Sequence, residues 1–269
     1  LSDMTDRVRE TLGSVDLIAA EDTRNSIRLL NHFGIKTPMT SYHEYNKVEK
    51  AYTLIAKMKE GQNIALICDA GTPAISDPGE VLVGMCHEEG IHVTSLPGPC
   101  ACITALTLSG LSSRRFCFEG FLPSDKQEKK LVLGSLKDEP RTIILYAAPH
   151  DLKKTLQELC ETLGERQIAI CRELTKRFEE VRRTTLAEAE MYYNTHEPKG
   201  EYVLVIEGKS FSQLEKETQS VWQQMPLEMH MAHYEAQGMD KKSAMKQVAK
   251  DRGISKREVY QSLLDAERD

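Results

Sequence analysis

The strongest structural signal in the chain lies in residues 61–109, GQNIALICDAGTPAISDPGEVLVGMCHEEGIHVTSLPGPCACITALTLS. Two short apolar runs, residues 64–68 and 91–96, flank an amphipathic segment at residues 81–89. This order predicts a strand, a helix and a second strand, which together form a parallel βαβ unit. In an open α/β sheet, the loops after parallel strands share one side of the sheet, and ligands bind there.

The loops that follow these two runs are rich in glycine and proline. The first spans residues 69–79, and the second contains Pro97, Gly98 and Pro99. Because glycine lets the main chain approach a ligand closely, we expect the loops to hold a flat, polar molecule by its edges. One such loop alone is as often an ordinary turn. Two of them, one strand apart, favour the binding interpretation.

Composition indicates a soluble globular protein. The chain has 269 residues, enough for two modest domains. Its formal net charge of −6 argues against a protein that binds nucleic acid over its whole surface. Any RNA contact therefore needs a local basic patch. No apolar run approaches the ~20 residues needed to cross a bilayer, and the first residues lack the features of a secretory signal.

The cysteines predict a reducing, cytoplasmic environment. There are seven of them, an odd number, and most lie in apolar runs, as buried free thiols do. Cys100 and Cys102 have no partner pair at ligand spacing, so no metal site is expected.

Polar residues gather after the apolar run at residues 17–20. Glu21, Asp22 and Arg24 stand where a short strand is expected to end, the position at which α/β proteins keep their chemistry. The competing interpretation is that Asp22 or Thr23 caps the helix expected at residues 25–33. A cap does not explain Arg24.

A second polar cluster precedes the helix expected at residues 48–59. His43 and Glu44 in this cluster are candidates for acid–base chemistry or substrate binding. A solvated cap of the following helix is the alternative interpretation.

The domain organisation is predicted from a break after an aromatic strand at residues 116–123. Residues 124–130 are polar and without periodicity, which is typical of a linker. We therefore expect an N-terminal α/β domain at residues 1–122, a second α/β domain at 123–209, and a connector with a helical tail at 210–269. The second domain should contain strands at residues 141–146, 167–172 and 202–207 with helices at 151–163 and 186–193.

The tail combines a helix, a turn at Gly253 and another helix, which resembles a helix-turn-helix. It is expected either to contact nucleic acid or a partner, or to be a small helical cap with solvated lysines.

Five motifs in order resemble one known family. They lie at residues 18–24, 62–73, 75–79, 96–100 and 199–208. Together they resemble the ribosomal RNA small subunit methyltransferase I family of the tetrapyrrole methylase superfamily. The resemblance covers residues 1–209 and extends more weakly into the tail.

This resemblance implies a class III methyltransferase of two α/β domains, usually a homodimer, with S-adenosyl-L-methionine in the cleft between them. The implied reaction is 2′-O-methylation of a cytidine ribose in 16S rRNA of the small ribosomal subunit. The cofactor contacts carried over by position come from both domains: Asp69, Ala70, Gly71, Thr72, Pro97, Gly98, Pro99, Cys100, Ala101, Tyr146, Ala147, Leu174, Gly200 and Glu201.

For the reaction itself, Glu21 or Asp22 is expected to help take the proton of the ribose hydroxyl, while Arg24 pairs with a substrate phosphate. The candidates for substrate binding are His43, Glu44, Lys176 and Arg177. Further basic residues that are candidates for an RNA path are Lys126, Lys129, Lys130, Arg182 and Arg183, although charge runs are usually solvated faces.

The sequence departs from the family pattern at two places. That pattern begins with a strand and a Thr-Pro-Ile-Gly-Asn loop, and Leu1 corresponds to a position just after it. The family also tends to have Tyr-Glu-Ser-Pro-His-Arg where residues 146–151 read Tyr-Ala-Ala-Pro-His-Asp. The second departure removes an acid and a base.

Two other functions stay open at this point. One is a methyltransferase of the same fold that acts on a small molecule such as a tetrapyrrole precursor. The other is a ribosome- or RNA-binding protein that keeps the cleft without catalysis.

Overall fold

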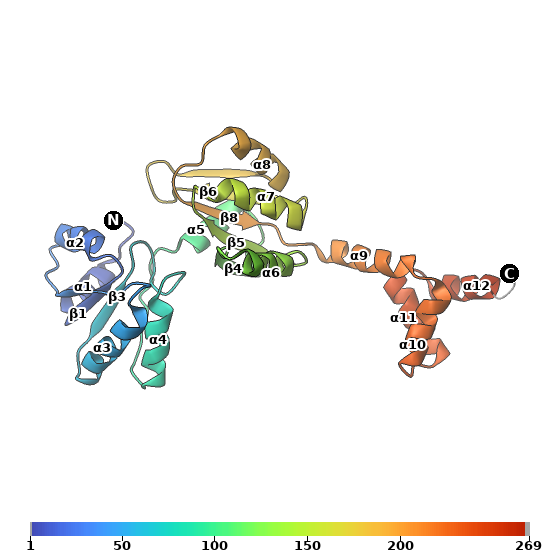
Figure 1. The fold of residues 1–269 in the computed structure, drawn as a ribbon, viewed down its shortest axis with the longest axis horizontal. Helices are drawn as coiled ribbons and strands as arrows, with labels where there is room; N and C mark the ends of the chain where they lie inside the picture. Colours follow the sequence, from blue (N-terminus) through green and yellow to red (C-terminus); the bar gives the residue numbers. More distant parts are fainter. Residues whose placement is uncertain (1, 267–269) are drawn as a thin grey trace.

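The computed structural model describes residues 2–266, which form two α/β units and a C-terminal helical unit (Figure 1). The first unit contains a parallel sheet in the order β2-β1-β3. Its strands are β1 (Leu17–Ala20), β2 (Met39–Ser41) and β3 (Ile64–Ile67). Its helices are α1 (Asp6–Ser14), α2 (Thr23–His32), α3 (Lys47–Lys59) and α4 (Gly79–Glu88).

Alternate residues of β1 face different cores, as the period of two in a strand requires. Ile18 packs with Leu12 of α1 and Leu30 of α2. Ala19 packs with Leu54 of α3 and Leu82 of α4. The short sheet is therefore covered by helices on both faces, which leaves its strand ends and their loops as the exposed edge.

The strand predicted at residues 91–96 is wrong. Within the described part of the chain, residues 91–100 form neither helix nor strand. Ile91 and Val93 nevertheless pack against the core of the first unit. The apolar run therefore reports burial, whereas a strand also requires a neighbouring backbone to pair with.

The second unit contains a five-stranded mixed sheet in the order β4-β5-β8-β6-β7. Strands β4 and β5 are parallel, and β8 runs antiparallel to both β5 and β6. The strands are β4 (Phe116–Phe121), β5 (Thr142–Ala147), β6 (Gln167–Arg172), β7 (Glu180–Thr185) and β8 (Tyr202–Ile206). The helices are α5 (Ala101–Ser109), α6 (Lys126–Leu136), α7 (Leu152–Leu163) and α8 (Leu186–Thr195).

The two faces of this sheet are covered unequally. Helices α6, α7 and α8 pack on one face around an extensive core that includes Leu145, Leu156 and Leu204. Helix α5 alone packs on the other face, where Cys102 and Leu106 contact Val203 and Val205.

The prediction of a linker at residues 124–130 is wrong, because residues 126–130 are the first turns of α6. Asp125 caps the helix by accepting hydrogen bonds from the N–H groups of Gln127 and Glu128. Its first turns are polar because the buried residues, Leu133 and Leu136, come later. The strand before the linker, β4, pairs with β5. It therefore belongs to the second sheet, although the predicted boundary after residue 122 assigns it to the first domain.

Two strands escaped prediction. β2 has only three residues. β7 reads EVRRTT and lies at the edge of its sheet, pairing with β6 alone. Because an edge strand can leave one face to solvent, its sequence need not contain an apolar run.

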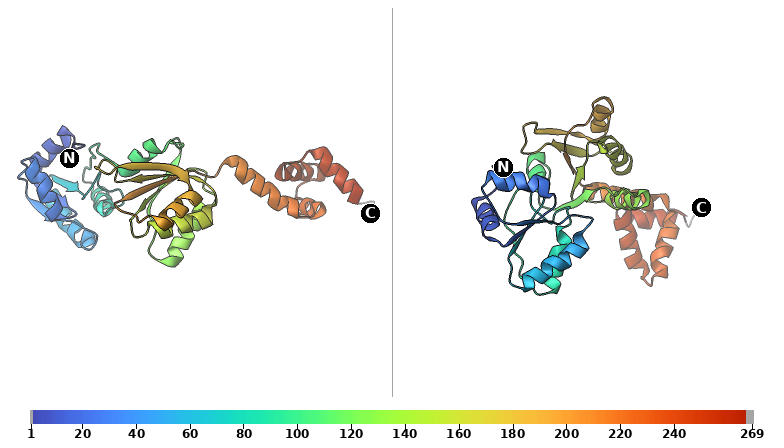
Figure 2. Two further views of the ribbon diagram at one scale, coloured as in Figure 1. Left: turned by 90° about the horizontal axis from the view of Figure 1, so that it is seen from above. Right: turned by 60° about the vertical axis from the view of Figure 1, so that its left-hand side comes forward.

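Residues 210–266 form a separate helical unit. The predicted connector is helix α9 (Phe211–Gln224), begun by a capping box of Ser210 and Gln213, and none of its residues is buried in the described structure. It leads to α10 (Leu227–Ala236), α11 (Lys241–Arg252) and α12 (Lys256–Ala266). Both views in Figure 2 show this unit at the end of the molecule away from the N-terminus.

The helical unit has a small core of its own, which includes Met231, Val248 and Val259. Gly253 adopts the left-handed conformation that ends α11 and turns the chain into α12, as the resemblance to a helix-turn-helix predicts. Within residues 2–266, no helix combines the length and apolar character that crossing a bilayer demands.

Candidate functional site

The two glycine- and proline-rich loops lie against each other, as predicted. The Thr72 hydroxyl donates a hydrogen bond of 3.0 Å to the carbonyl oxygen of Pro99. A Cβ atom added at Gly71 would lie 3.2 Å from that same oxygen, and one added at Gly98 would lie 3.2 Å from the Thr72 hydroxyl. We call residues 69–79 together with 97–100 the first wall of the site. Glycine at both positions permits the close approach.

Asp77 holds the first wall in shape. Its carboxylate accepts hydrogen bonds from the backbone N–H groups of Ala74 (3.0 Å), Ile75 (3.3 Å) and Gly79 (2.8 Å). Ala74 and Ser76 have φ angles of 66° and 63°, a left-handed conformation that costs energy in residues with a Cβ atom. The three hydrogen bonds offset that cost, so the loop depends on this one side chain.

A buried hydroxyl and a partly buried thiol lie beneath the first wall. The Tyr42 hydroxyl donates to the carbonyl oxygen of Pro78 at 3.0 Å, and burial raises the pKa of Tyr42 to about 12. The Cys68 thiol donates to the carbonyl oxygen of Ala70 at 3.2 Å, and burial raises its pKa to about 11. Both groups are therefore neutral hydrogen-bond donors near pH 7, and neither is an ionised nucleophile.

The predicted catalytic residues lie beside the first wall but differ in their contacts. The Glu21 carboxylate accepts a hydrogen bond of 3.2 Å from the N–H group of Asp69. Asp22 caps α2 by accepting from the N–H group of Arg24, and it also pairs with the Arg24 guanidinium at 2.9 Å. The hydrogen bond from Arg24 lowers the pKa of Asp22. The structure confirms that Asp22 caps α2, and its role in the site stays a prediction.

A hollow of about 280 Å³ lies between α2 and the loop at Asp69. Asn25 closes one side of it, with its amide 3.4 Å from the Asp69 carboxylate. The lining residues are Asn25, Ser26, Arg28, Leu29, Cys68 and Asp69.

The second unit contributes an apolar surface close to the end of the first wall. Cys100, which follows Pro99, packs in one cluster with Tyr146 at the end of β5 and with Leu174 in the loop after β6. The Tyr146 ring meets Phe118 edge to face, at 4.9 Å between centroids. Burial raises the pKa of Tyr146, so its hydroxyl stays neutral. We call Tyr146, Leu174 and Gly200 the second wall.

Paired backbone and charged groups fix the end of the second wall. The N–H group of Glu173 donates to the Glu201 carbonyl at 3.0 Å, and the N–H group of Glu201 donates to the Glu173 carboxylate at 2.9 Å. Lys176 bridges both acids, at 3.1 Å from Glu173 and 2.7 Å from Glu201. Gly200 has a φ of +85°, and a Cβ atom there would lie 2.5 Å from the Glu173 side chain.

The four predicted substrate-binding residues have local partners. The backbone N–H group of His43 donates to the Asn46 side chain at 2.8 Å, and the Glu44 carboxylate pairs with Lys47 at 2.6 Å. Lys176 is held by its two acids. Arg177 lies over the ring of Phe178, 5.6 Å from its centroid. Among the described residues, the buried Nδ1 atom of His43 has no hydrogen-bond partner.

Comparison with known proteins identifies the family. Residues 1–190 match the family model for tetrapyrrole (corrin/porphyrin) methylases. The chain is 46% identical to ribosomal RNA small subunit methyltransferase I of Bacillus subtilis (strain 168) over 260 residues, which cover 97% of this chain and 89% of the relative. The corresponding protein of Haemophilus influenzae is 50% identical over 212 residues, 78% of this chain and 75% of the relative. The chain belongs to the ribosomal RNA small subunit methyltransferase I family.

Solved structures support the fold of this family member. Diphthine synthase superposes with a TM-score of 0.62 and 15% identity, covering 80% of this chain and 88% of the other. Uroporphyrin-III-C-methyltransferase from Thermus thermophilus gives a TM-score of 0.53 at 17% identity, with 76% and 88% covered. These identities indicate a shared fold only.

Sequence reasoning missed two residues that shape the site in this family member. Asp77 belongs to the motif at residues 75–79 but is not among the predicted site residues, although an Asp-Pro-Gly sequence after a strand is a signal for a turn organised by a carboxylate. Tyr42 belongs to the polar cluster that contains His43 and Glu44. Its side chain is only 1% exposed, and this burial results from tertiary packing, which a local sequence pattern does not indicate. Within residues 2–266, no group of three or more His, Cys, Asp or Glu side chains is placed to hold a metal ion.

Proposed function

We propose that this chain transfers a methyl group from S-adenosyl-L-methionine to the 2′-oxygen of a cytidine ribose in 16S rRNA of the small ribosomal subunit. One observation carries the proposal: two loops with bare main chain, joined from Thr72 to Pro99, end against the apolar second wall at Cys100. A relative that is 46% identical over 97% of this chain is named ribosomal RNA small subunit methyltransferase I.

The residues present fit the cofactor. Gly71 and Gly98 leave the main chain uncovered where a Cβ atom would clash or crowd, and Tyr146 with Leu174 offers an apolar face for a ring. When bound, S-adenosyl-L-methionine supplies an electrophilic methyl group on a sulfonium. The residues proposed to hold it are Asp69, Ala70, Gly71, Thr72, Pro97, Gly98, Pro99, Cys100, Ala101, Tyr146, Ala147, Leu174, Gly200 and Glu201.

Methyl transfer of this kind depends chiefly on alignment of the reacting groups. A ribose hydroxyl is a poor nucleophile until it loses its proton, so a nearby base accelerates the reaction. Glu21 is the better placed carboxylate, because it lies at the Asp69 loop. Asp22 is occupied by the cap and by Arg24, and its lowered pKa makes it a weak base. We assign Asp22 to positioning Arg24.

Arg24 is proposed to bind a phosphate of the RNA. Its side chain is 89% exposed although it pairs with Asp22. A guanidinium has five N–H donors, and Asp22 uses two of them on this side chain. The remaining donors are free to meet a phosphate in a bidentate manner. His43, Glu44, Lys176 and Arg177 remain weaker candidates, because each already has a local partner.

The test is transfer of tritium from labelled S-adenosyl-L-methionine to small ribosomal subunits, naked 16S rRNA and uroporphyrinogen in parallel. The proposal expects label in RNA, released as a 2′-O-methylated cytidine. Label in uroporphyrinogen alone would show a small-molecule enzyme. Cofactor binding by calorimetry without any transfer would indicate a binding protein.

Site variants sharpen the same assay. Glu21→Gln should lower turnover at saturating RNA by about 100-fold, whereas Asp22→Asn should chiefly raise the KM for RNA by loosening Arg24. If both variants keep full turnover, the assignment of a base at this position is wrong.

Assembly and location belong to the proposal as well. We expect a cytoplasmic homodimer, as the family resemblance implies, and sedimentation of the purified chain tests the oligomeric state. The α11–α12 pair is a candidate second contact with the ribosome. Deleting residues 210–269 should then raise the KM for subunits while leaving cofactor affinity unchanged.

A further inference from the structure

Two thiols meet at the point where the first wall ends. Cys100 is the last residue of that wall and stands at the N-cap position of α5, and Cys102 lies in the first turn of the helix. Their Sγ atoms are 3.2 Å apart. All seven cysteines of the chain are free thiols. None of the roles assigned above uses this contact, because Cys100 alone is proposed to hold the cofactor.

The two thiols differ in exposure. Cys102 is 4% exposed and belongs to the core beneath α5, whereas Cys100 is only partly buried and packs against that core. Burial raises the pKa of the Cys102 thiol to about 11, so it stays protonated near pH 7. Oxidants react with accessible thiolates. Cys100 is therefore the sulfur that an oxidant reaches first, and Cys102 is the sulfur next to it.

The spacing of the two residues permits a bond between the sulfurs. Residues two apart in a chain have Cα atoms within about 7 Å of each other, and disulfides span Cα separations of up to ~6.8 Å. A disulfide bond is ~2.05 Å long. From their present separation of 3.2 Å, the sulfurs therefore have to approach by about 1 Å, which rotation of the two side chains can supply.

The backbone around Cys100 is fixed by hydrogen bonds. Its carbonyl oxygen accepts from the N–H group and from the hydroxyl of Thr104, both at 2.9 Å. The carbonyl oxygen of the preceding residue, Pro99, accepts from Thr72. The movement that closes a bond between the sulfurs consequently falls on the side chains and not on the turn.

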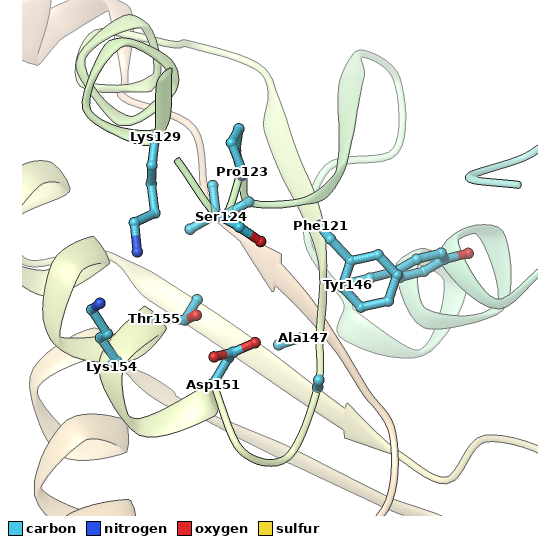
Figure 3. A pocket seen from close by; sticks show the side chains of 11 residues that line it. Phe121, Pro123, Ser124, Lys129, Tyr146, Ala147, Asp151, Lys154 and Thr155 are labelled. Carbon is cyan, nitrogen blue, oxygen red and sulfur yellow. The ribbon is translucent and has the colours of Figure 1, made fainter. Parts of the chain in front are cut away.

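The neighbours of the two thiols belong to the second wall. Cys100, Tyr146 and Leu174 pack against the core that contains Cys102. Figure 3 shows the Tyr146 ring beside that of Phe121, on the side of β5 away from a hollow of about 360 Å³ between α6 and α7. The ring thus lies on the α5 face of the sheet, with the thiols. A shift of either sulfur changes the apolar face that is proposed to hold the cofactor.

We propose that Cys100 and Cys102 form a reversible disulfide when a peroxide oxidises the chain, and that this bond weakens cofactor binding. Bond formation depends on the two sulfurs alone. Its effect on binding rests on the proposed function, because it requires that S-adenosyl-L-methionine binds beside Cys100.

The reaction consumes one hydrogen peroxide for each bond. The Cys100 thiolate attacks a peroxide oxygen, the O–O bond breaks, and Cys100 becomes a sulfenic acid while the departing hydroxide takes up the thiol proton as water. The Cys102 sulfur then attacks the Cys100 sulfur and displaces its hydroxyl group, which leaves as a second water with the Cys102 proton. The two sulfurs together lose the two electrons that the peroxide gains.

The bond suits a transient response to oxidants. In a reducing compartment thiols stay reduced, and disulfides there are usually short-lived and redox-sensing. A bond across one intervening residue closes a small ring, and strained disulfides are the ones most readily reduced. A dithiol reductant should therefore restore both thiols and, with them, the original affinity for the cofactor.

Treatment of the full chain with one equivalent of hydrogen peroxide tests the bond and its effect. Thiol titration in denaturant should show the loss of two of the seven thiols, and peptide mass spectrometry with fragmentation should place the bond between Cys100 and Cys102. Calorimetry before and after treatment measures the affinity for S-adenosyl-L-methionine. It should fall by about tenfold and return after incubation with dithiothreitol.

Cys102→Ser removes the second sulfur and leaves Cys100 in place. Cys102 has no proposed contact with the cofactor, so the untreated variant should bind S-adenosyl-L-methionine as the unchanged chain does. After peroxide treatment it should contain no disulfide, and its affinity should change by less than about twofold. Cys102→Ala carries the same expectation without placing a hydroxyl in the core.

Cys160 provides the matched control. It is partly buried, as Cys100 is, but it packs in the core on the other face of the sheet. Cys160→Ser should still form the bond and lose affinity on oxidation. A treated chain that keeps all its thiols, a bond between other cysteines or between two chains, or an equal loss of affinity in the Cys102→Ser variant and the unchanged chain would each overturn the inference.

Failure of the inference can be told apart from failure of the proposed function. If the function is wrong, the reduced chain does not bind S-adenosyl-L-methionine, the effect on binding is refuted with it, and mass spectrometry still finds the bond. If only the inference is wrong, the reduced chain binds the cofactor and labels small ribosomal subunits, and peroxide lowers its affinity no more than that of Cys102→Ser.

Discussion

The two walls of the proposed cofactor site are held in place by different means. The first wall consists of loops with left-handed residues, kept in shape by a single carboxylate, Asp77, and by one contact between Thr72 and Pro99. The second wall extends from the strands of a five-stranded sheet, and a network of backbone and charged groups around Glu173 fixes its end. The first wall should therefore be sensitive to single substitutions, whereas the second should tolerate them.

The largest effect is expected from Asp77→Ala. Three backbone N–H groups lose their acceptor, and the left-handed residues lose the support that offsets their strain. Cofactor affinity, measured by calorimetry, should fall by about 30-fold, and the free energy of unfolding should fall by about 2 kcal/mol.

Asp16→Ala is the control for this prediction. The Asp16 carboxylate also accepts from a backbone N–H group, that of Asn63 at 2.7 Å, but it precedes β1 and so lies at the end of the sheet away from the site. It should lose about 1 kcal/mol of stability and no cofactor affinity. Equal losses of affinity in the two variants would refute the special role of Asp77.

A smaller effect is expected from Gly71→Ala, which tests the close approach of the two loops. Gly71 has a φ of +83° and would place a Cβ atom 3.2 Å from the Pro99 carbonyl oxygen. Gly61 has a comparable φ of +92°, and within the described structure nothing lies within 4 Å of its added Cβ atom. Each alanine variant should lose about 1–2 kcal/mol of stability. Only Gly71→Ala should also lose cofactor affinity, by about tenfold.

The contrast between the walls also explains why the first wall could be predicted from the sequence. The loop at Asp69 and the bend at Gly98 were predicted together, because glycine and proline mark backbone geometry locally. The parallel strand expected before the bend is wrong, but Ile91 and Val93 pack against the core of the first unit and so keep the bend on its side. Their meeting is confirmed by the contact between Thr72 and Pro99. The α/β class was predictable for the same reason, from runs and periods within the chain.

The second wall needed information that no local pattern contains. Tyr146, Leu174 and Cys100 pack against one cluster only because the strands of a mixed sheet are ordered as they are. Without the family resemblance, nothing in the sequence joins these distant residues. The polar start of α6 and the charged edge strand β7 were missed because their stability comes from a cap and from pairing, which apolar periodicity does not report.

On the second wall, Lys176→Met should have a modest effect. Lys176 is half exposed and bridges Glu173 and Glu201, and pairs of this kind contribute about 0.5–1 kcal/mol. Both hydrogen bonds between the two acids remain in the variant, one to the Glu201 carbonyl and one to the Glu173 carboxylate. Cofactor affinity should therefore change by less than about threefold. Arg177→Met, which removes the adjacent cation, is the control and should leave cofactor affinity unchanged. A loss comparable with that of Asp77→Ala would show that the second wall is as fragile as the first.

The smallest effect is expected from the ionisation of Tyr42, which lies beneath the first wall. It changes the free energy of unfolding only at alkaline pH. Burial raises the pKa of Tyr42 from 10.0 to about 12, so the folded chain keeps this hydroxyl protonated while the unfolded chain ionises. The contribution to stability is complete below pH 10 and is lost as the pH rises toward 12. Between about pH 9 and pH 11 the free energy of unfolding should fall by about 1 kcal/mol on account of this group.

Urea titrations of the unchanged chain and of Tyr42→Phe separate the effect of Tyr42 from that of the other tyrosines. At neutral pH the variant should be less stable by about 1 kcal/mol, because it loses the hydrogen bond to Pro78. In alkali its free energy of unfolding should decline less steeply than that of the unchanged chain. Parallel declines in the two proteins would mean that the Tyr42 hydroxyl is not protected from ionisation, and that the first wall is held by Asp77 and the contact between Thr72 and Pro99 without it.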